Sequence, residues 1–336
     1  MSAETVGTVV SLWRYPVKSM MGEELNACDV TERGLCGDRA YGLVDQETGK
    51  LASAKHPRKW GRLFDFRADF VEPPRVGAPT PPVRITFPRG ASVTSEEPGV
   101  SRLLSEALGR PVVLMTSAPA DSSFEEVWPA VKGGRLYGTT LSEREEGDLV
   151  TDVPAAFRAP AGTFFDFCAI HLVTTNTLDR LRELAPAHRF EARRFRPNLV
   201  VEVPDRRGFV ENDWSRRVVT VGDVRLKVII PTARCVMTTL GQGDLPRDPG
   251  VLRAMAEHNR IRAGGLGELP CAGVYAFVVT GGPSGAAIRS ASSRALSATG
   301  RCRGRRWRVV RPGWPRPGSS RRWAGRAAPS AAREAR

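Results

Sequence analysis

The segment Val218-Val-Thr-Val-Gly-Asp-Val-Arg-Leu-Lys-Val-Ile-Ile-Pro-Thr-Ala-Arg-Cys decides the fold of this chain. Apolar residues alternate with basic ones after the Gly222-Asp223 pair, which is the pattern of a β-hairpin with a tight turn. Pro231 has no N–H to donate, so we expect it to stop the ladder. The segment therefore predicts two paired strands that end by presenting Cys235 in a loop.

Two interpretations of Cys235 stay open at this point. Arg234 precedes it and two threonines follow it, and an electropositive, hydroxyl-rich loop of this kind lowers a thiol pKa and raises the thiolate fraction. The alternative is a structural cysteine, because free cysteine is among the most buried residue types. The first interpretation predicts a site where a soft metal could bind sulfur.

Short motifs occur in order on both sides of this segment. They are Tyr15-Pro-Val-Lys-Ser19, Gly37-Asp-Arg39, Phe195-Arg-Pro-Asn198 and Arg234-Cys235, followed by a strand-like Gly273-Val-Tyr275. Together they resemble the MOSC family, named for the molybdenum cofactor sulfurase C-terminal domain. The likeness is to its two-part members, in which an N-terminal β-barrel domain precedes the MOSC domain, as in the amidoxime-reducing branch, and it spans about residues 5 to 282.

Many short strands with few helices favour an α+β, β-rich fold over a doubly wound sheet. Apolar periodicity predicts helices over 100–109, 178–184 and 249–261, and strands over 164–172, 199–203 and 274–280. The resemblance implies a small N-terminal β-barrel domain followed by a MOSC-type β-barrel domain with a few helices. The expected division is an N-terminal MOSC-type β domain over 1–120, an irregular linker over 121–160, the MOSC domain over 161–282 and a tail over 283–336.

The resemblance implies a molybdenum cofactor, Mo-molybdopterin, and assigns the residues that bind it. The predicted site consists of Lys18, Ser19, Arg39, Arg196, Asn198, Arg234, Thr238 and Tyr275 as cofactor-binding residues, with Cys235 as metal ligand and catalytic residue. Molybdenum accepts thiolate sulfur, and a guanidinium fork grips a phosphate or a pterin edge. Because Lys18 and Arg39 belong to the N-terminal domain, we expect the site to lie between the two domains.

The sequence indicates the roles of several other residues around the predicted site less specifically. Asp166 is expected near the pocket, Cys168 is expected to pack, and His171 is expected to be a hydrogen-bonded core residue. Asn198 can donate and accept at a heterocycle edge, and Thr238 can donate to the sulfur or to the cofactor. None of the four histidines forms a nucleophile-base arrangement with a neighbour in the sequence.

The resemblance implies a molybdenum-dependent oxidoreductase that reduces N-hydroxylated small molecules. The chain has no cysteine set for an iron–sulfur cluster, so a separate electron-transfer protein of ferredoxin or reductase type is expected. The alternative function is a non-catalytic molybdenum cofactor carrier or a sulfur-handling protein. A third class, a nucleic-acid-binding protein, draws support only from the tail.

Composition restricts the compartment and explains the charge. The six cysteines are scattered without C-x-x-C spacing, and the chain has no apolar run of about 18 residues and no basic, apolar leader. These features predict a cytoplasmic protein that does not span a membrane.

The net charge lies almost entirely in the tail. Residues 281–336 hold fourteen arginines and one acid, so they carry +13 of the net +14. We expect no packed structure and no specific nucleic-acid binding from this tail. A shifted reading frame in a G+C-rich gene accounts for its lack of lysine, and a genuine basic extension is the alternative.

Overall fold

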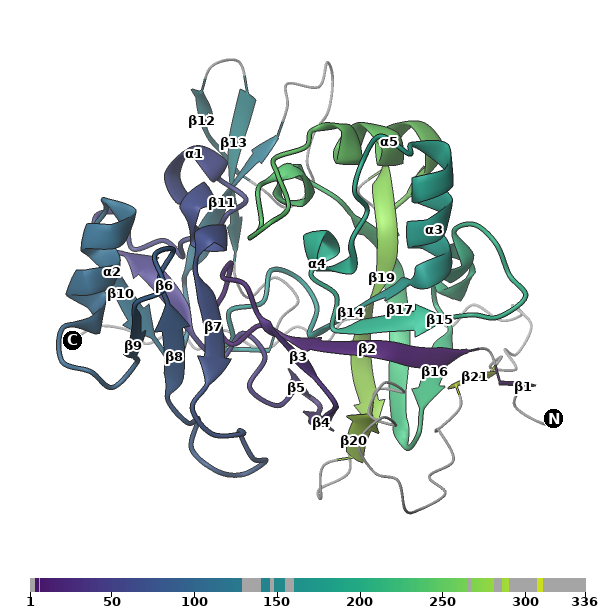
Figure 1. The fold of residues 1–336 in the computed structure, drawn as a ribbon, viewed down its shortest axis with the longest axis horizontal. Helices are drawn as coiled ribbons and strands as arrows, with labels where there is room; N and C mark the ends of the chain where they lie inside the picture. Colours follow the sequence, from purple (N-terminus) through teal and green to yellow (C-terminus); the bar gives the residue numbers. More distant parts are fainter. Residues whose placement is uncertain are drawn as a thin grey trace, which may run out of the picture.

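The computed structural model describes residues 4–5, 7–128, 140–145, 148–154, 160–264, 267–280, 286–289 and 307–310. The fold is α+β and rich in strands, as predicted, and Figure 1 shows a set of small sheets beside one large sheet.

The large sheet has ten strands and is mostly antiparallel. In spatial order its path is β1 (Glu4–Thr5), β21 (Trp307–Val310), β16 (Val218–Val221), β17 (Val224–Ala233), β19 (Glu268–Thr280), β14 (Ile170–Thr174), β15 (Leu199–Glu202), β2 (Thr8–Arg14) and β3 (Glu23–Leu25), with β18 (Arg260–Arg262) on β19. Among the described strands of this sheet, only β14 and β15 run parallel, and the segment between them contains the helices α3 (Thr175–Leu184) and α4 (Ala192–Phe195). The N-terminal strands β2 and β3 thus belong to the sheet that the C-terminal half builds.

The smaller sheets hold the rest of the N-terminal half. They are β6 (Gly42–Asp45) with β10 (Val112–Met115); β7 (Arg67–Phe70), β8 (Val83–Thr86) and β9 (Ser92–Thr94); β11 (Ser123–Trp128), β13 (Asp148–Pro154) and β12 (Thr140–Glu145); and β20 (Ala286–Arg289), β4 (Ala27–Thr31) and β5 (Gly34–Leu35). The described helices are α1 (Pro57–Trp60), α2 (Val100–Leu108), α3 (Thr175–Leu184), α4 (Ala192–Phe195) and α5 (Gly250–His258), with 3-10 turns η1 (Gly61–Asp65), η2 (Val210–Trp214) and η3 (Val236–Thr239).

The hairpin predicted around Gly222-Asp223 is confirmed, and β16 pairs with β17 in the expected antiparallel register. The prediction that Pro231 ends the ladder is wrong, since β17 continues to Ala233. Pro231 is opposite Val274 between two register shifts of the β17–β19 pair. A proline is tolerated at such an irregularity because no regular ladder bond requires its missing N–H.

Separate hydrophobic cores stabilise the two halves. One face of the large sheet packs around Leu12, Leu172 and Leu226, and the other packs against α3 and α5 through Leu181 and Met255. A third core, which includes Leu63, Phe66 and Leu104, lies within the N-terminal sheets.

Three expected segments differ in the structure. Residues 123–128 and 148–154 of the predicted irregular linker form paired strands, and the rest of that linker is only partly described. The helix predicted over 249–261 ends at His258, and the strand predicted over 164–172 begins only at Ile170.

Two strands fall in the predicted tail, where no packed structure was expected. β20 pairs with β4 and buries Ile288, while β21 pairs with β16. The remaining tail residues lie outside the described part of the chain, so the boundary at residue 282 stays a prediction.

The five described cysteines, Cys28, Cys36, Cys168, Cys235 and Cys271, are all free thiols. None of the described helices combines the length and apolar character that crossing a membrane requires.

Candidate functional site

A pocket lies between the two halves of the molecule, with an empty volume of about 790 Å³ including its open mouth. It is called the cofactor pocket below. All nine residues of the predicted site line it, although they come from segments far apart in the chain: Lys18, Ser19, Arg39, Arg196, Asn198, Arg234, Cys235, Thr238 and Tyr275. Asp166, Cys168 and His171 also line it. The structure therefore brings the predicted residues together between the two halves, and their binding of a cofactor stays a prediction.

Cys235 is half-buried at the junction of β17 and η3. Thr238 Oγ1 donates to the Cys235 carbonyl at 3.0 Å and closes the turn. Arg194, fully buried on α4, donates to the carbonyls of Thr238 at 3.4 Å, Leu240 at 3.2 Å and Pro246 at 2.8 Å. The bonds to Thr238 and Leu240 cap carbonyls at the end of η3, and the bond to Pro246 ties the segment that follows, so Arg194 holds the loop that carries the thiol.

The expectation of a lowered thiol pKa at Cys235 is wrong for the protein alone. Loss of hydration and the nearby Glu126 carboxylate raise the pKa of Cys235 to about 11, while Lys55 acts in the opposite direction. Sequence adjacency to Arg234 misled the prediction because that guanidinium points elsewhere.

Arg234 is anchored by backbone carbonyls. Its Nε donates to Ala272 O at 2.8 Å, its Nη1 donates to Phe195 O at 3.0 Å, and its Nη2 contacts both Ala272 O and His171 Nε2. Burial and the adjacent Arg234 charge lower the pKa of His171 well below its usual range, so the imidazole is neutral and accepts this bond. Arg234 thus positions the start of the Cys235 loop, and its direct contact with a cofactor stays a prediction.

Gly273 makes the contact between His171 and Arg234 possible. It has φ +81°, and a Cβ placed there would lie 2.3 Å from Leu172 O and 2.5 Å from His171 Nε2. Only glycine fits this position without strain.

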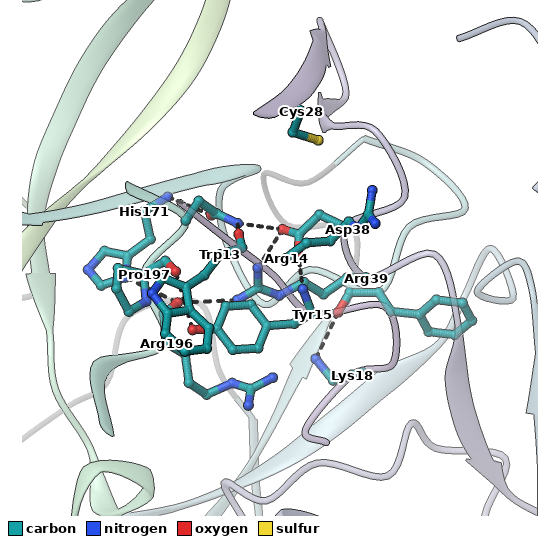
Figure 2. A network of polar contacts seen from close by, with 12 residues as sticks. Trp13, Arg14, Tyr15, Lys18, Cys28, Asp38, Arg39, His171, Arg196 and Pro197 are labelled. Atoms are coloured by element: carbon teal, nitrogen blue, oxygen red, sulfur yellow. Dashed lines mark hydrogen bonds and ion pairs between the residues drawn. The ribbon is translucent and has the colours of Figure 1, made fainter. Parts of the chain in front are cut away.

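Asp38 joins the two halves behind the pocket (Figure 2). Its carboxylate accepts from Tyr15 N at 2.8 Å and Asn198 Nδ2 at 2.8 Å, and it pairs with Arg39. Asn198 also donates to Trp13 O at 3.3 Å and accepts from His171 N at 3.0 Å. The side-chain amide of Asn198 is therefore already hydrogen-bonded to other residues of the protein. Its proposed role at a heterocycle edge stays a prediction.

Arg196 is the pocket guanidinium with the most free donors. It adopts a left-handed φ of 52°, and its Cζ lies 4.2 Å from the Tyr15 ring centroid and 5.3 Å from that of Phe64. Nη1 donates to Met20 O at 2.7 Å, and no described residue accepts from Nε or Nη2. Burial and the Arg39 charge lower the pKa of Arg196 to about 10, so it stays cationic at neutral pH.

An ion-pair chain crosses the pocket from Lys18 to Glu126. Lys18 Nζ contacts Asp166 Oδ1, Lys55 Nζ lies 3.9 Å from Asp166 Oδ2, and Lys55 Nζ lies 3.2 Å from Glu126 Oε1. The prediction missed Lys55, Glu126 and Arg194. No motif marks the first two, because they become neighbours only when β11 packs beside the segment before α1.

The residues present fit an anionic cofactor that brings metal ligands of its own. Six lining side chains are cationic and two are carboxylates. In the described part of the chain, no three His, Cys, Asp or Glu side chains cluster as a metal site would require. A metal held by the Cys235 thiolate would therefore take its other ligands from a non-protein group, and the free Arg196 donors suit a phosphate.

Comparisons with known proteins agree with this architecture. The family described as "MOSC N-terminal beta barrel domain" matches residues 6–71, and the "MOSC domain" family matches residues 161–318. Mitochondrial amidoxime reducing component 2 of Rattus norvegicus is 26% identical over 273 residues, covering 70% of this chain and 68% of the relative. Mitochondrial amidoxime-reducing component 1 of Homo sapiens is 24% identical over 268 residues, covering 70% and 67%.

A solved structure, YiiM from Geobacillus stearothermophilus, aligns with a TM-score of 0.28 and 16% identity, covering 53% of this chain and 75% of that one.

Proposed function

This chain carries a MOSC N-terminal beta barrel domain followed by a MOSC domain, and from that premise we propose that it is a molybdenum-cofactor-dependent reductase of N-hydroxylated small molecules. The names of the mitochondrial relatives support the reaction class. A separate electron-transfer protein of ferredoxin or reductase type supplies the electrons in this proposal.

One observation carries the proposal. The free thiol of Cys235 lies in a cation-rich pocket, on a loop that Arg194 holds in place. The same pocket contains Arg196, whose Nε and Nη2 have no acceptor among the described residues, and Lys18 and Lys55 from the N-terminal half. Such a pocket combines a soft ligand for a metal with charge for a phosphate.

The chain's own residues divide the work. Cys235 would ligate the metal as a thiolate, a state that the metal's charge would favour over the neutral thiol of the protein alone. Arg196, Arg39 and Lys18 would bind the phosphate and the pterin edges. When bound, the cofactor supplies the two-electron chemistry that removes oxygen from nitrogen.

The rest of the pocket orients and shields the reaction. Phe165, Phe167 and Tyr275 give it apolar walls, and the ring centroids of Phe167 and Tyr275 lie 5.3 Å apart. Walls of this kind limit water around the reacting groups and strengthen the polar contacts made there.

Elemental analysis of protein purified from a host that makes the cofactor tests the binding step. We expect molybdenum in the parent, little in Cys235→Ser because a hydroxyl is a poor soft-metal ligand, and parent levels in Cys168→Ser. Equal molybdenum in Cys235→Ser and the parent contradicts the assignment of the ligand.

Turnover of benzamidoxime with a reduced viologen dye tests the reaction. We expect the amidine product from the parent and none from Cys235→Ser. Full molybdenum occupancy without turnover of this or any other N-hydroxylated probe would instead favour the carrier function.

A further inference from the structure

The cofactor pocket contains a carboxylate that the proposed function leaves unused. Glu126, on β11, is one of the two acidic residues among the described lining residues, and its side chain is only 8% exposed. The other acid, Asp166, is engaged through both oxygens with Lys18 and Lys55.

One carboxylate oxygen of Glu126 makes no hydrogen bond or ion pair with a described residue. Oε1 faces Lys55 Nζ at 3.2 Å, while Oε2 has no partner among the described residues. Among the described residues, Oε2 has neither a partner nor complete burial, so this oxygen is open to the pocket. A molecule bound in the pocket can therefore donate a hydrogen bond to it.

The charge of Glu126 relates it to the substrate more than to the cofactor. A carboxylate repels an anionic cofactor but accepts a hydrogen bond from an N–H group. Glu126 lies in the sheet β11–β13–β12, which Figure 1 shows at the junction of the two halves. This sheet falls between the two family matches, residues 6–71 and 161–318, so Glu126 belongs to a part of the chain that neither family model describes.

We propose that Glu126 determines substrate specificity by accepting a hydrogen bond from an N–H group of amidine-type substrates, namely N-hydroxyamidines and N-hydroxyguanidines. This inference rests on the proposed function. These molecules carry an NH₂ group on the carbon next to the N–OH nitrogen. Hydroxamic acids carry a carbonyl oxygen there, whose lone pairs face the carboxylate. A site built to accept an N–H rejects the analogue that lacks it, because its own acceptor stays unpaired.

The geometry sets the form of the contact. Since Oε1 is engaged with Lys55, the substrate meets Oε2 through one charge-assisted bond and not through a two-bond fork. Loss of one such bond lowers the preference by about tenfold or more.

The test compares kcat/KM for benzamidoxime and benzohydroxamic acid, which share the ring and differ in NH₂ versus oxygen at the adjacent carbon. In Glu126→Gln we expect the ratio of the two values to fall about tenfold or more, with molybdenum content at the parent level. The matched control is Glu125→Gln in the same strand, which pairs with Lys50 and Lys59 outside the pocket and should keep the parent ratio. An unchanged ratio in Glu126→Gln overturns the inference.

Calorimetric binding of benzamidine gives a readout that needs no turnover. We expect its Kd to rise about tenfold or more in Glu126→Gln and to keep the parent value in Glu125→Gln. Equal binding by the parent and Glu126→Gln overturns the inference even if the reductase activity is found. Absence of molybdenum and of all turnover, with Glu126-dependent benzamidine binding, overturns the proposed function and supports this site.

Discussion

Replacing Gly273 with alanine perturbs the node that holds the cysteine loop. Two free-energy costs add when a Cβ is placed at this position. A residue with a Cβ at φ +81° costs about 1–2 kcal/mol, and the new Cβ would overlap Leu172 O at 2.3 Å and His171 Nε2 at 2.5 Å. Leu172 lies in β14, paired with β19 on the same ladder, so the contact cannot relax by a side-chain rotation. Overpacking of this kind costs about 1–3 kcal/mol more.

We therefore expect Gly273→Ala to lose about 2–5 kcal/mol of the free energy of unfolding, measured by urea titration with circular dichroism. Gly208→Ala is the matched control, because Gly208 has φ +84° with no atom within 4 Å of the position of a Cβ. It should lose only the conformational part, about 1–2 kcal/mol. Equal losses in the two variants would refute the argument that Gly273 makes room for His171 beside Arg234.

Three further predictions follow from the pocket's supports. Arg194→Met removes the donors to the carbonyls of Thr238, Leu240 and Pro246 and should lower the free energy of unfolding by about 3 kcal/mol in urea titration; a loss under 1 kcal/mol contradicts the bracing role. Glu211 on η2 is fully buried and accepts from Gly273 N at 3.0 Å and from Thr177 Oγ1 at 2.6 Å. Burial raises the pKa of Glu211, so its contribution to stability is present at low pH and is lost as pH rises through the folded-state pKa; urea titrations at pH 5 and pH 8 should show parent stability falling relative to Glu211→Gln, and a constant difference argues against it. Lys18→Ala and Arg39→Ala should each reduce molybdenum content in folded protein, and parent-level occupancy in both leaves the N-terminal half without a binding role.

The sequence predicted which residues meet in the pocket more successfully than what each one does there. All nine nominated residues line it, because short motifs mark the strand ends and turns that converge on it. Their hydrogen bonds depend on the backbone that faces them. Arg234 and Asn198 were predicted to grip a ligand, yet carbonyls of Ala272, Phe195 and Trp13 take most of their donors.

Local patterns also predicted elements better than pairings. The alternation over 218–230 and the periodicity over 178–184 gave correct elements, since both signals lie within a single segment. The sheet formed by β11 and β13 was missed because its pairing partners are separated by a segment rich in charge and poor in apolar alternation. Glu126 was missed with it.

The pairing of β2 with β15 delays formation of the large sheet until most of the chain has been synthesised. Leu12 is opposite Leu199, so during synthesis the strand β2 waits for a partner that is made much later. Until that partner emerges, β2 presents unpaired N–H and C=O groups, which is the condition that favours mispairing and aggregation. The same pairing means that a fragment cut at the sequence boundary near residue 160 leaves β15 without its neighbour. Closure of the large sheet is therefore a late, long-range event, and such events slow folding.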